Sequence, residues 1–383
     1  MSRKEKKAAA RSAAPERTEP SGRDQAASDV LYLAGCAVNG TVPDAQRVAG
    51  MDLQAVYDVA CAHLLVAVAA HALESAGIQD PRFVQAKAMA IRKMALMDVE
   101  MAAVLARFEE AGIWYLPMKG ALLKDLYPDY GIREMADRDI LVDPDRADEV
   151  RGIMEDLGFT TTMFDRKYHD CYEKLPVSNF EIHRSIIGPY AGETMVRYYE
   201  NVKDRLLKDE GNQYGWHFTP EDFYVFLVAH EYKHYSTAGT GLRSVLDVYV
   251  CLQKMKPDLA YVTAECEKLG IAEFERNGRE LVLALFGGGE LTEAGRGMLA
   301  FMTSSGVYGS EENRAENTLN EKGRLGYFLS RLTLPWYGMT ELYPVLKKAP
   351  VLYPFCWTHR LVHAAIHKRQ KVLFQLKAGL RRK

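Results

Sequence analysis

The chain has 383 residues, of which 48% are hydrophobic and 26% charged, and its formal net charge is -2. This length allows roughly two or three domains with a sizeable core, and the composition is that of a globular protein and not of a fibrous or fully disordered one. The small net charge gives no overall electrostatic reason to expect nucleic acid as a partner, so any phosphate site must be local.

The N-terminal segment, residues 1–28, is rich in charged residues and Ala and has almost no apolar side chains. It cannot offset the entropy cost of ordering, so we expect disorder there, a folded part that begins near Asp29, and no signal peptide. The six cysteines form no C-x-x-C pair, which favours reduced thiols in the cytoplasm. The longest apolar stretch, residues 64–70, is far shorter than the roughly 20 residues of a spanning helix. We therefore expect no membrane segment and no membrane among the partners.

Helices and strands alternate in the middle of the chain. Helical spacing of apolar residues comes first, in residues 55–76 and 84–111, with Gly77 and Gly112 as stop signals. Beyond these the pattern predicts strands at 113–118, 138–142, 159–164 and 177–183, and helices at 120–127 and 146–157. The sequence predicts an α/β (α+β) fold: a small mixed-sheet core at 113–188 between helical regions at 29–112 and 189–383.

The C-terminal region is mostly helical in its pattern. Residues 223–235 and 242–255 are apolar-periodic segments, whereas residues 308–322 are polar and Asn-rich and are predicted to form a loop or lid. The final segment, residues 367–383, has seven Lys or Arg residues and no acid. Such a tail is typical of a solvated helix end, and it could also contact an acidic partner.

Two carboxylates at i and i+2 begin one of the predicted strands. Because alternate side chains of a strand share a face, Asp137 and Asp139 can point at one cation. The same alternation places Glu181 and His183 together on the strand at 177–183. If the two strands are neighbours in one sheet, Glu181 is a third carboxylate in the same cleft. Three acids can hold Mg²⁺, or Mn²⁺ in its place, for in-line displacement at a nucleotide α-phosphate.

An Asp-x-Asp pair taken alone is weak evidence, because chance supplies about one in a chain of this length. The chain has a second pair, Asp143-Pro-Asp145, at the start of the predicted helix at 146–157. Acids at that position cap a helix N-terminus, and we interpret this pair as capping. The structural alternative for Asp137 and Asp139 is a turn followed by an exposed strand start.

The arrangement of several motifs adds to this evidence. Lys119-Gly120, Tyr127-Pro128, Arg133, Asp137-Arg-Asp139 and Glu181-Ile-His183 follow one another over about 75 residues. This order resembles the nucleotidyltransferase superfamily to which DNA polymerase beta belongs, and more closely a bacterial family of uncharacterised nucleotidyltransferases. A weaker resemblance extends through His230, His234 and Asp247.

The resemblance implies roles for individual residues. Asp137, Asp139 and Glu181 would be the metal ligands and catalytic carboxylates of a Mg²⁺-dependent enzyme that moves a nucleoside monophosphate from an NTP to an acceptor hydroxyl. The acceptor itself is not implied. Lys119 with the Gly120 backbone N–H would contact the triphosphate, and Arg133 is a candidate bidentate phosphate contact. Further nucleotide contacts would come from His183, on the strand that carries Glu181, and from Lys233, His234 and Arg243 in the C-terminal helical region.

The chain departs from the superfamily pattern in two places. The short helix begins with Lys119-Gly120 where Gly-Ser is more common, and the residue between the two aspartates is Arg138 where an apolar residue is usual. A buried arginine must snorkel or pair with an acid. These departures leave open a second function, that of a nucleotide-binding or regulatory module that has lost turnover.

A third hypothesis comes from His230-Glu231-Tyr-Lys-His234, which matches the H-E-x-x-H motif of zinc hydrolases. Its helical setting is suitable, but Lys233 within the motif is unusual and no third ligand motif follows. A separate series, His359, His363 and His367, recurs every four residues and is more typical of a solvated helix face.

Overall fold

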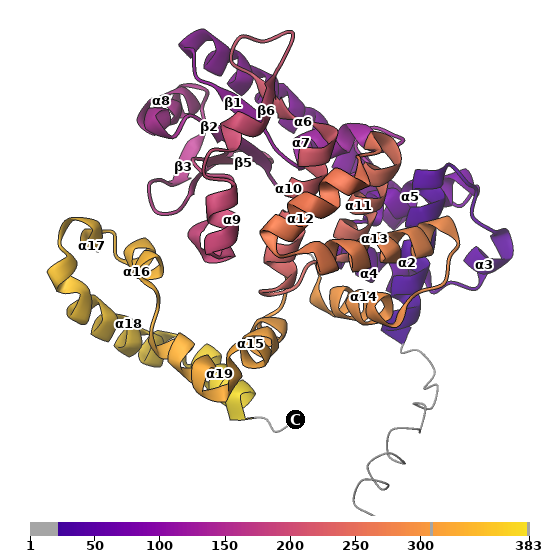
Figure 1. The fold of residues 1–383 in the computed structure, drawn as a ribbon. Helices are drawn as coiled ribbons and strands as arrows, with labels where there is room; N and C mark the ends of the chain where they lie inside the picture. Colours follow the sequence, from indigo (N-terminus) through magenta and orange to yellow (C-terminus); the bar gives the residue numbers. More distant parts are fainter. Residues whose placement is uncertain (1–21, 307–308, 381–383) are drawn as a thin grey trace, which may run out of the picture.

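The computed structural model describes residues 22–306 and 309–380. Helices form most of this part of the chain and surround a five-stranded sheet (Figure 1). Helices from the C-terminal end extend away from the body as an arm. The prediction of a small mixed sheet between helical regions is confirmed.

The sheet has the strand order β1-β2-β5-β4-β3. Its strands are β1 (Tyr115–Pro117), β2 (Arg138–Val142), β3 (Thr160–Met163), β4 (His169–Lys174) and β5 (Ser178–His183). The pair β2 and β5 is parallel, and the other neighbours are antiparallel. Asp139 lies opposite Glu181 in the register of β2 and β5, and His169 lies opposite His183 in that of β4 and β5. Three adjacent strands therefore carry a row of polar side chains.

The two faces of the sheet are covered differently. Ile140, Phe180 and Ile182 point to one face, where they share a core with α6 (Pro81–Ala111) and α8 (Ala147–Asp156). Leu141 points to the other face, toward a second core that includes α10 (Pro220–Tyr235). Strand alternation places Asp139, Glu181 and His183 on this second face. The polar row thus faces α10.

A third core joins the two ends of the body. The N-terminal helices are α2 (Gly22–Asn39), α3 (Ala45–Ala49), α4 (Leu53–Ala62) and α5 (Val66–Ser75). The later helices of the body are α9 (Glu193–Tyr198), α11 (Leu242–Met255), α12 (Leu259–Leu269), α13 (Ala272–Gly287) and α14 (Glu293–Ser305). Buried side chains of α2, α4 and α5 pack with those of α11, α13 and α14. The boundaries proposed at residues 112 and 188 remain predictions, and this core includes residues from both sides of them.

The arm consists of α15 (Glu311–Leu332), α16 (Trp336–Leu342), α17 (Val345–Lys348), α18 (Tyr353–His367) and α19 (Arg369–Leu380). Figure 1 shows it as a hook that turns back toward the sheet. Lys347 donates from Nζ to the backbone oxygen of Asp165, over 2.9 Å, in the loop before β4. In the part of the chain that the structure describes, no helix combines the length and apolar character needed to cross a membrane.

Several strand and helix predictions are confirmed, and others are wrong. Strand β2 and helix α11 have the predicted bounds, whereas the segment 55–76 is two helices separated at residues 63–65, where Leu64 has a φ of 52°. Residues 22–28, which we expected to be disordered, are instead the first turns of α2, in which Ala26 and Ala27 are buried. Residues 1–21 of the predicted disordered segment lie outside the described residues.

The predicted loop at 308–322 is wrong from Glu311 onward. That segment is the first half of α15, and the side chain of Ser310 caps it by accepting from the Asn313 backbone N–H. Its polar composition reflects an exposed helix with few apolar contacts and not a turn. The sequence reasoning also missed β4 and the small antiparallel pair β6 (Leu206–Lys208) and β7 (Trp216–Phe218).

Candidate active site

A cavity of about 390 Å³ lies between the polar row of the sheet and helices α10 and α11. Four acidic residues line it: Asp137, Asp139, Glu181 and Glu231. Four basic residues line it as well: Lys119, Lys167, Lys233 and Arg243. Its histidines are His169, His183, His230 and His234. The structure therefore gathers most of the predicted site residues around one cavity, with three of the acids at β2 and β5 and the fourth, Glu231, on α10.

Asp139 contacts a nitrogen-bearing side chain through each of its carboxylate oxygens. Its Oδ1 lies 2.9 Å from Nε2 of His183, and its Oδ2 lies 3.7 Å from Nζ of Lys119. Burial alone would raise the pKa of Asp139, but Lys119 and His183 hold it below the ordinary value. This carboxylate stays ionised and ready to bind a cation.

The other two acids of the sheet behave oppositely. Burial raises the pKa of Asp137, and the neighbouring charge of Asp139 adds to that effect. The pKa of Glu181 is raised by burial and then by Asp139 and Asp137. Carboxylates that share a site without a counterion hold their protons more strongly, and a bound cation would relieve this repulsion.

Arg138, between the two aspartates, points away from the cavity. Its side chain is fully buried against α6, where the guanidinium pairs with Asp98 and one Nη lies 3.2 Å from Sδ of Met94. Burial lowers the pKa of Arg138, and Asp98 opposes that shift. The arginine thus fastens β2 to α6, and it occupies no space near the carboxylates.

Lys119 is held in a strained backbone conformation at the end of β1. Its φ is 38°, although it carries a side chain, and it precedes the short helix α7 (Gly120–Leu123). Its Nζ lies 2.5 Å from Nε2 of His230 on α10. Non-glycine residues in such conformations are found at functional sites more often than elsewhere. Gly120 does not line the cavity; a Cβ there would come within 2.8 Å of Sδ of Met135, so close packing requires glycine.

His169 is a site residue that the sequence reasoning missed. Its Nε2 lies 3.6 Å from Oε2 of Glu181, and His183 lies 3.7 Å from the same oxygen. One ligand atom from each of these three residues falls within 4.8 Å of the others. Burial, with the nearby His183, lowers the pKa of His169 to about 3, so its imidazole is neutral and able to bind a metal ion. Residues 169–174 carry little strand pattern in the sequence, because Tyr172 is the single large apolar side chain among them.

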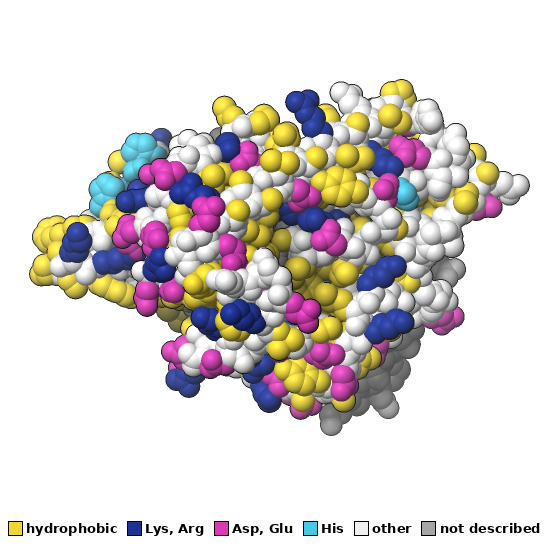
Figure 2. Space-filling model, turned by 90° about the horizontal axis from the view of Figure 1, so that it is seen from above, with side chains coloured by type: hydrophobic (Ala, Val, Ile, Leu, Met, Phe, Trp, Pro, Cys, Tyr) yellow, Lys and Arg dark blue, Asp and Glu magenta, His cyan; other side chains and the backbone are white. Residues whose placement is uncertain are grey.

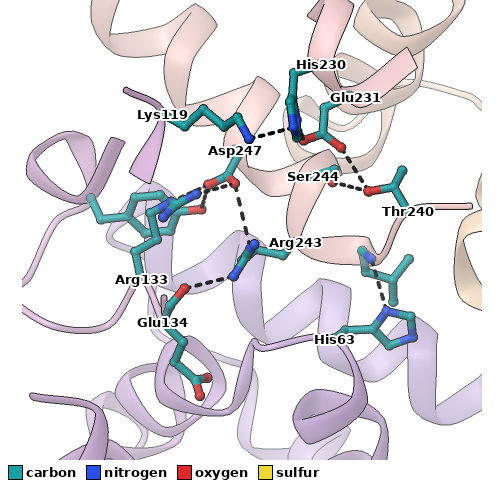
Figure 3. Close-up of polar contacts among 12 residues, drawn as sticks. His63, Lys119, Arg133, Glu134, His230, Glu231, Thr240, Arg243, Ser244 and Asp247 are labelled. Carbon is teal, nitrogen blue, oxygen red and sulfur yellow. Dashed lines mark hydrogen bonds and ion pairs between the residues drawn. The ribbon is translucent and has the colours of Figure 1, made fainter. Parts of the chain in front are cut away.

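Arg133 lies outside the cavity, in a buried ion pair (Figure 3). Its Nε and Nη2 donate to the two carboxylate oxygens of Asp247 on α11, over 2.7 and 2.8 Å. Tyr127 donates to the same carboxylate over 2.8 Å. Asp247 therefore takes the bidentate contact that the sequence assigned to phosphate, and Arg133 fixes the segment before β2 to α11.

Arg243, one turn before Asp247, reaches the cavity from α11. One Nη donates to the backbone oxygen of Glu134 over 2.9 Å, and its Nε lies 3.9 Å from Asp247 (Figure 3). The Glu134 carboxylate in turn accepts from the backbone N–H of Ala67 in α5. These contacts hold the Arg243 guanidinium beside the cavity that it lines.

Comparison with protein-family models matches residues 49–287 to the family described as uncharacterised nucleotidyltransferase. The chain belongs to this family. The match covers every residue of the cavity described above, and family membership supports nucleotidyl transfer as the general reaction. Comparisons with curated proteins and with solved structures found no match.

The H-E-x-x-H residues of this nucleotidyltransferase lie in the same cavity. Nε2 of His230 and Nε2 of His234 are 3.0 Å apart, and Lys119 contacts the first of them. Glu231 accepts from Oγ1 of Thr240 over 2.8 Å. Within residues 22–306 and 309–380, no third metal-binding side chain joins the two histidines, because the one three-residue cluster found is His169, Glu181 and His183. The motif therefore forms a wall of the nucleotidyltransferase cavity and lacks the ligand set of a zinc hydrolase.

Proposed function

We propose that this protein transfers a nucleoside monophosphate from a Mg²⁺-bound NTP to an acceptor hydroxyl, with release of pyrophosphate. The observation that carries the proposal is that Asp137, Asp139 and Glu181 line one cavity together with Lys119, Lys233 and Arg243. Oxygen-only ligands of this kind suit Mg²⁺, which binds through one or two carboxylates and completes its shell with water and substrate phosphates.

The ligand residues fit a cation on the evidence of their own electrostatics. Asp139 is ionised and accepts contacts from two cationic or polar groups, while Asp137 and Glu181 hold protons more tightly than usual. Such a set has an excess of negative charge that a divalent ion would balance. A bound Mg²⁺ would supply positive charge to the α-phosphate and to the attacking oxygen.

The basic residues of the cavity would bind the triphosphate. Lys119 lines the cavity from the end of β1, Lys233 from α10 and Arg243 from α11. Burial and the nearby Lys119 lower the pKa of Lys233 to about 8, so a phosphate beside it would favour its protonated form. Displacement of Lys119 from Asp139 to phosphate would free that carboxylate for the cation. His183 and His234 would add hydrogen bonds to phosphate or ribose.

The chemical step forms a bond between the acceptor oxygen and the α-phosphorus and breaks the bond from that phosphorus to the bridging oxygen of the β-phosphate. The proton of the acceptor hydroxyl goes to a carboxylate. Glu181 is the better acceptor of that proton, because burial and the two aspartates raise its pKa whereas Lys119 and His183 hold the pKa of Asp139 low. Arg133 acts as a positioning residue through Asp247.

The nearby imidazoles favour Mn²⁺ as a second usable cation. His169 and His183 add nitrogen ligands beside Glu181, and imidazole binds first-row transition ions better than it binds Mg²⁺. We therefore propose that Mn²⁺ can replace Mg²⁺ as the cation that supports transfer.

A thermal-shift screen with four NTPs, each with and without Mg²⁺, tests the proposal. An NTP at about one hundred times its dissociation constant should add about 2.7 kcal/mol to the folded state. Stabilisation should require the metal and should be lost in Asp139→Asn. The same stabilisation without turnover would support the binding-module hypothesis, and a flat screen for all four NTPs would contradict both.

A further inference from the structure

The C-terminal arm lies outside the residues that match the nucleotidyltransferase family, and its surface is unusual. Half of the exposed large hydrophobic side chains in the described residues lie after residue 324. Soluble surfaces seldom carry such a concentration of apolar side chains without a binding role. Figure 2 shows hydrophobic side chains gathered at the left end of the molecule, where the arm projects in Figure 1.

The apolar side chains of the arm form stripes. In α18, Phe355, Val362 and Ile366 follow the spacing i, i+7 and i+11, which places them on one helix face, and they are 74%, 52% and 58% exposed. In α15, Leu325 and Leu329 are one turn apart and also exposed. An apolar stripe on a helix normally packs against another part of the protein or against a partner, yet these side chains face solvent.

The last part of the arm, from Leu342 onward, carries charge of one sign only. From Leu342 to Lys383 the sequence has ten Lys or Arg residues and no Asp or Glu. Since the whole chain has a net charge of -2, residues 1–341 together have a formal charge of about -12, from the same sequence count. In α19 the exposed residues Arg369, Leu373 and Lys377 follow one another at intervals of four, so basic and apolar side chains share a face.

We propose that the arm docks on the surface of an anionic phospholipid bilayer. Apolar stripes flanked by Lys and Arg are the mark of helices that lie in the membrane interface, where apolar side chains enter the acyl boundary and the bases meet lipid phosphates. The acidic body would be repelled by such a surface, whereas the basic residues of the arm would be attracted to it. The proposal extends the sequence expectation of an acidic partner for the basic tail and revises the expectation that no membrane is a partner.

Internal contacts keep the arm in shape for this role. Nε1 of Trp357 in α18 donates to the backbone oxygen of Leu332 at the end of α15, over 2.8 Å. Tyr343 contacts Nδ1 of His359 over 2.8 Å. The contact of Lys347 with Asp165 then ties the arm to the loop before β4. The exposed stripes are thus presented by a folded unit that is attached to the body near the cavity.

Vesicle sedimentation with the full chain tests the proposal. Sucrose-loaded vesicles of phosphatidylcholine alone are compared with vesicles that contain about 30% phosphatidylglycerol, an anionic lipid. We expect binding to the second kind, and a large decrease when the salt concentration is raised from about 0.1 M to about 1 M. Equal binding to both kinds, or binding to neither, would overturn the proposal.

Two sets of variants separate the charges from the apolar stripe. Changing Lys368, Arg369 and Lys377 to Gln should lower the partition coefficient by about a hundredfold, since each basic residue near such a surface contributes about a factor of five. The matched control changes Lys208, Lys254 and Arg276, which are exposed on the body, and should leave binding unchanged. Equal losses in both sets would contradict docking through the arm.

The apolar set changes Phe355, Val362 and Ile366 to Ser and should lower binding by at least about tenfold. Its control changes Val42, Met89 and Val99 to Ser, which are 66%, 64% and 69% exposed on the body. Unchanged NTP-dependent stabilisation in every variant would show that the body is folded. Sedimentation velocity without lipid tests whether the arm instead binds a second copy of the chain, and a dimer that the apolar set dissociates would overturn the proposal. Tighter binding to RNA than to anionic vesicles would also overturn it.

Discussion

The clearest energetic prediction concerns Arg133, for which the sequence and the structure suggest different roles. In the structure Arg133 and Asp247 are 5% and 3% exposed and make two charge-assisted hydrogen bonds. The change Arg133→Met removes both bonds and keeps most of the side-chain volume. It leaves the Asp247 carboxylate buried, with Tyr127 as its remaining close donor and Arg243 at 3.9 Å.

The loss should be large because a buried charge would lose its partner. Breaking one member of a buried ion pair costs about 3–5 kcal/mol, chiefly through the uncompensated charge that remains. Urea denaturation followed by circular dichroism measures this loss as a change in the free energy of unfolding. The double variant Arg133→Met with Asp247→Leu removes both charges and should recover most of it. Arg133→Lys keeps the charge but cannot form the bidentate contact, so its free energy of unfolding should lie between those of the unaltered protein and Arg133→Met.

A matched control is the exposed pair of Arg197 with Glu193, whose side chains are 75% and 76% exposed. Arg197→Met should change the free energy of unfolding by less than about 0.5 kcal/mol. If Arg133→Met instead unfolds like the unaltered protein and loses NTP affinity, the buried ion pair is not its role, and Arg133 contacts phosphate as the sequence pattern indicated.

Three other predictions concern pH, substrate and metal. Burial lowers the pKa of His63 from 6.5 to about 4. On acidification this histidine is therefore protonated in the unfolded chain before it is protonated in the folded one. The free energy of unfolding should be constant above about pH 6.5 and should fall by about 3 kcal/mol toward pH 4. Urea titrations at several pH values should show a weaker fall in His63→Asn, and an equal fall would contradict this. Lys119→Met should raise the KM for NTP by roughly ten- to a hundredfold, because it removes a charge-assisted contact to phosphate; an unchanged KM with a lower kcat would place Lys119 elsewhere. His169→Ala should weaken Mn²⁺ binding, measured by electron paramagnetic resonance, by roughly tenfold or more, and it should leave Mg²⁺ binding unchanged. Equal losses of affinity for both ions would count against the imidazoles as metal ligands.

The parts of the fold that the sequence predicted well have strong local patterns. Strand β2 ends in the run Ile140, Leu141 and Val142, which are all buried, and α11 has a clear apolar face, so each was found with its bounds. The second Asp-x-Asp pair was also interpreted correctly, since Asp143 accepts from the backbone N–H of Asp145. In these cases local chemistry alone decides the structure.

The parts that could not be predicted depend on contacts between distant segments. Arg138 looked like an obstacle between two acids, but its partner Asp98 lies forty residues earlier on α6, which no local pattern reveals. Arg133 finds Asp247 across 114 residues. His169 entered the site through the register of β4 with β5, a strand that the sequence reasoning missed. Which side chains face one another is decided by the tertiary arrangement.

The most direct test of nucleotidyl transfer follows the α- and γ-phosphates of the NTP separately. NTP labelled at either the α- or the γ-phosphate is incubated with the protein, Mg²⁺ and a pool of small hydroxyl-bearing metabolites. The α-label should appear on an acceptor and the γ-label in pyrophosphate, and both should disappear in Asp139→Asn. The control variant, Asp143→Asn with Asp145→Asn, alters the capping pair and should retain transfer. Movement of the γ-label to the acceptor, or unchanged transfer in Asp139→Asn, would contradict nucleotidyl transfer at these carboxylates.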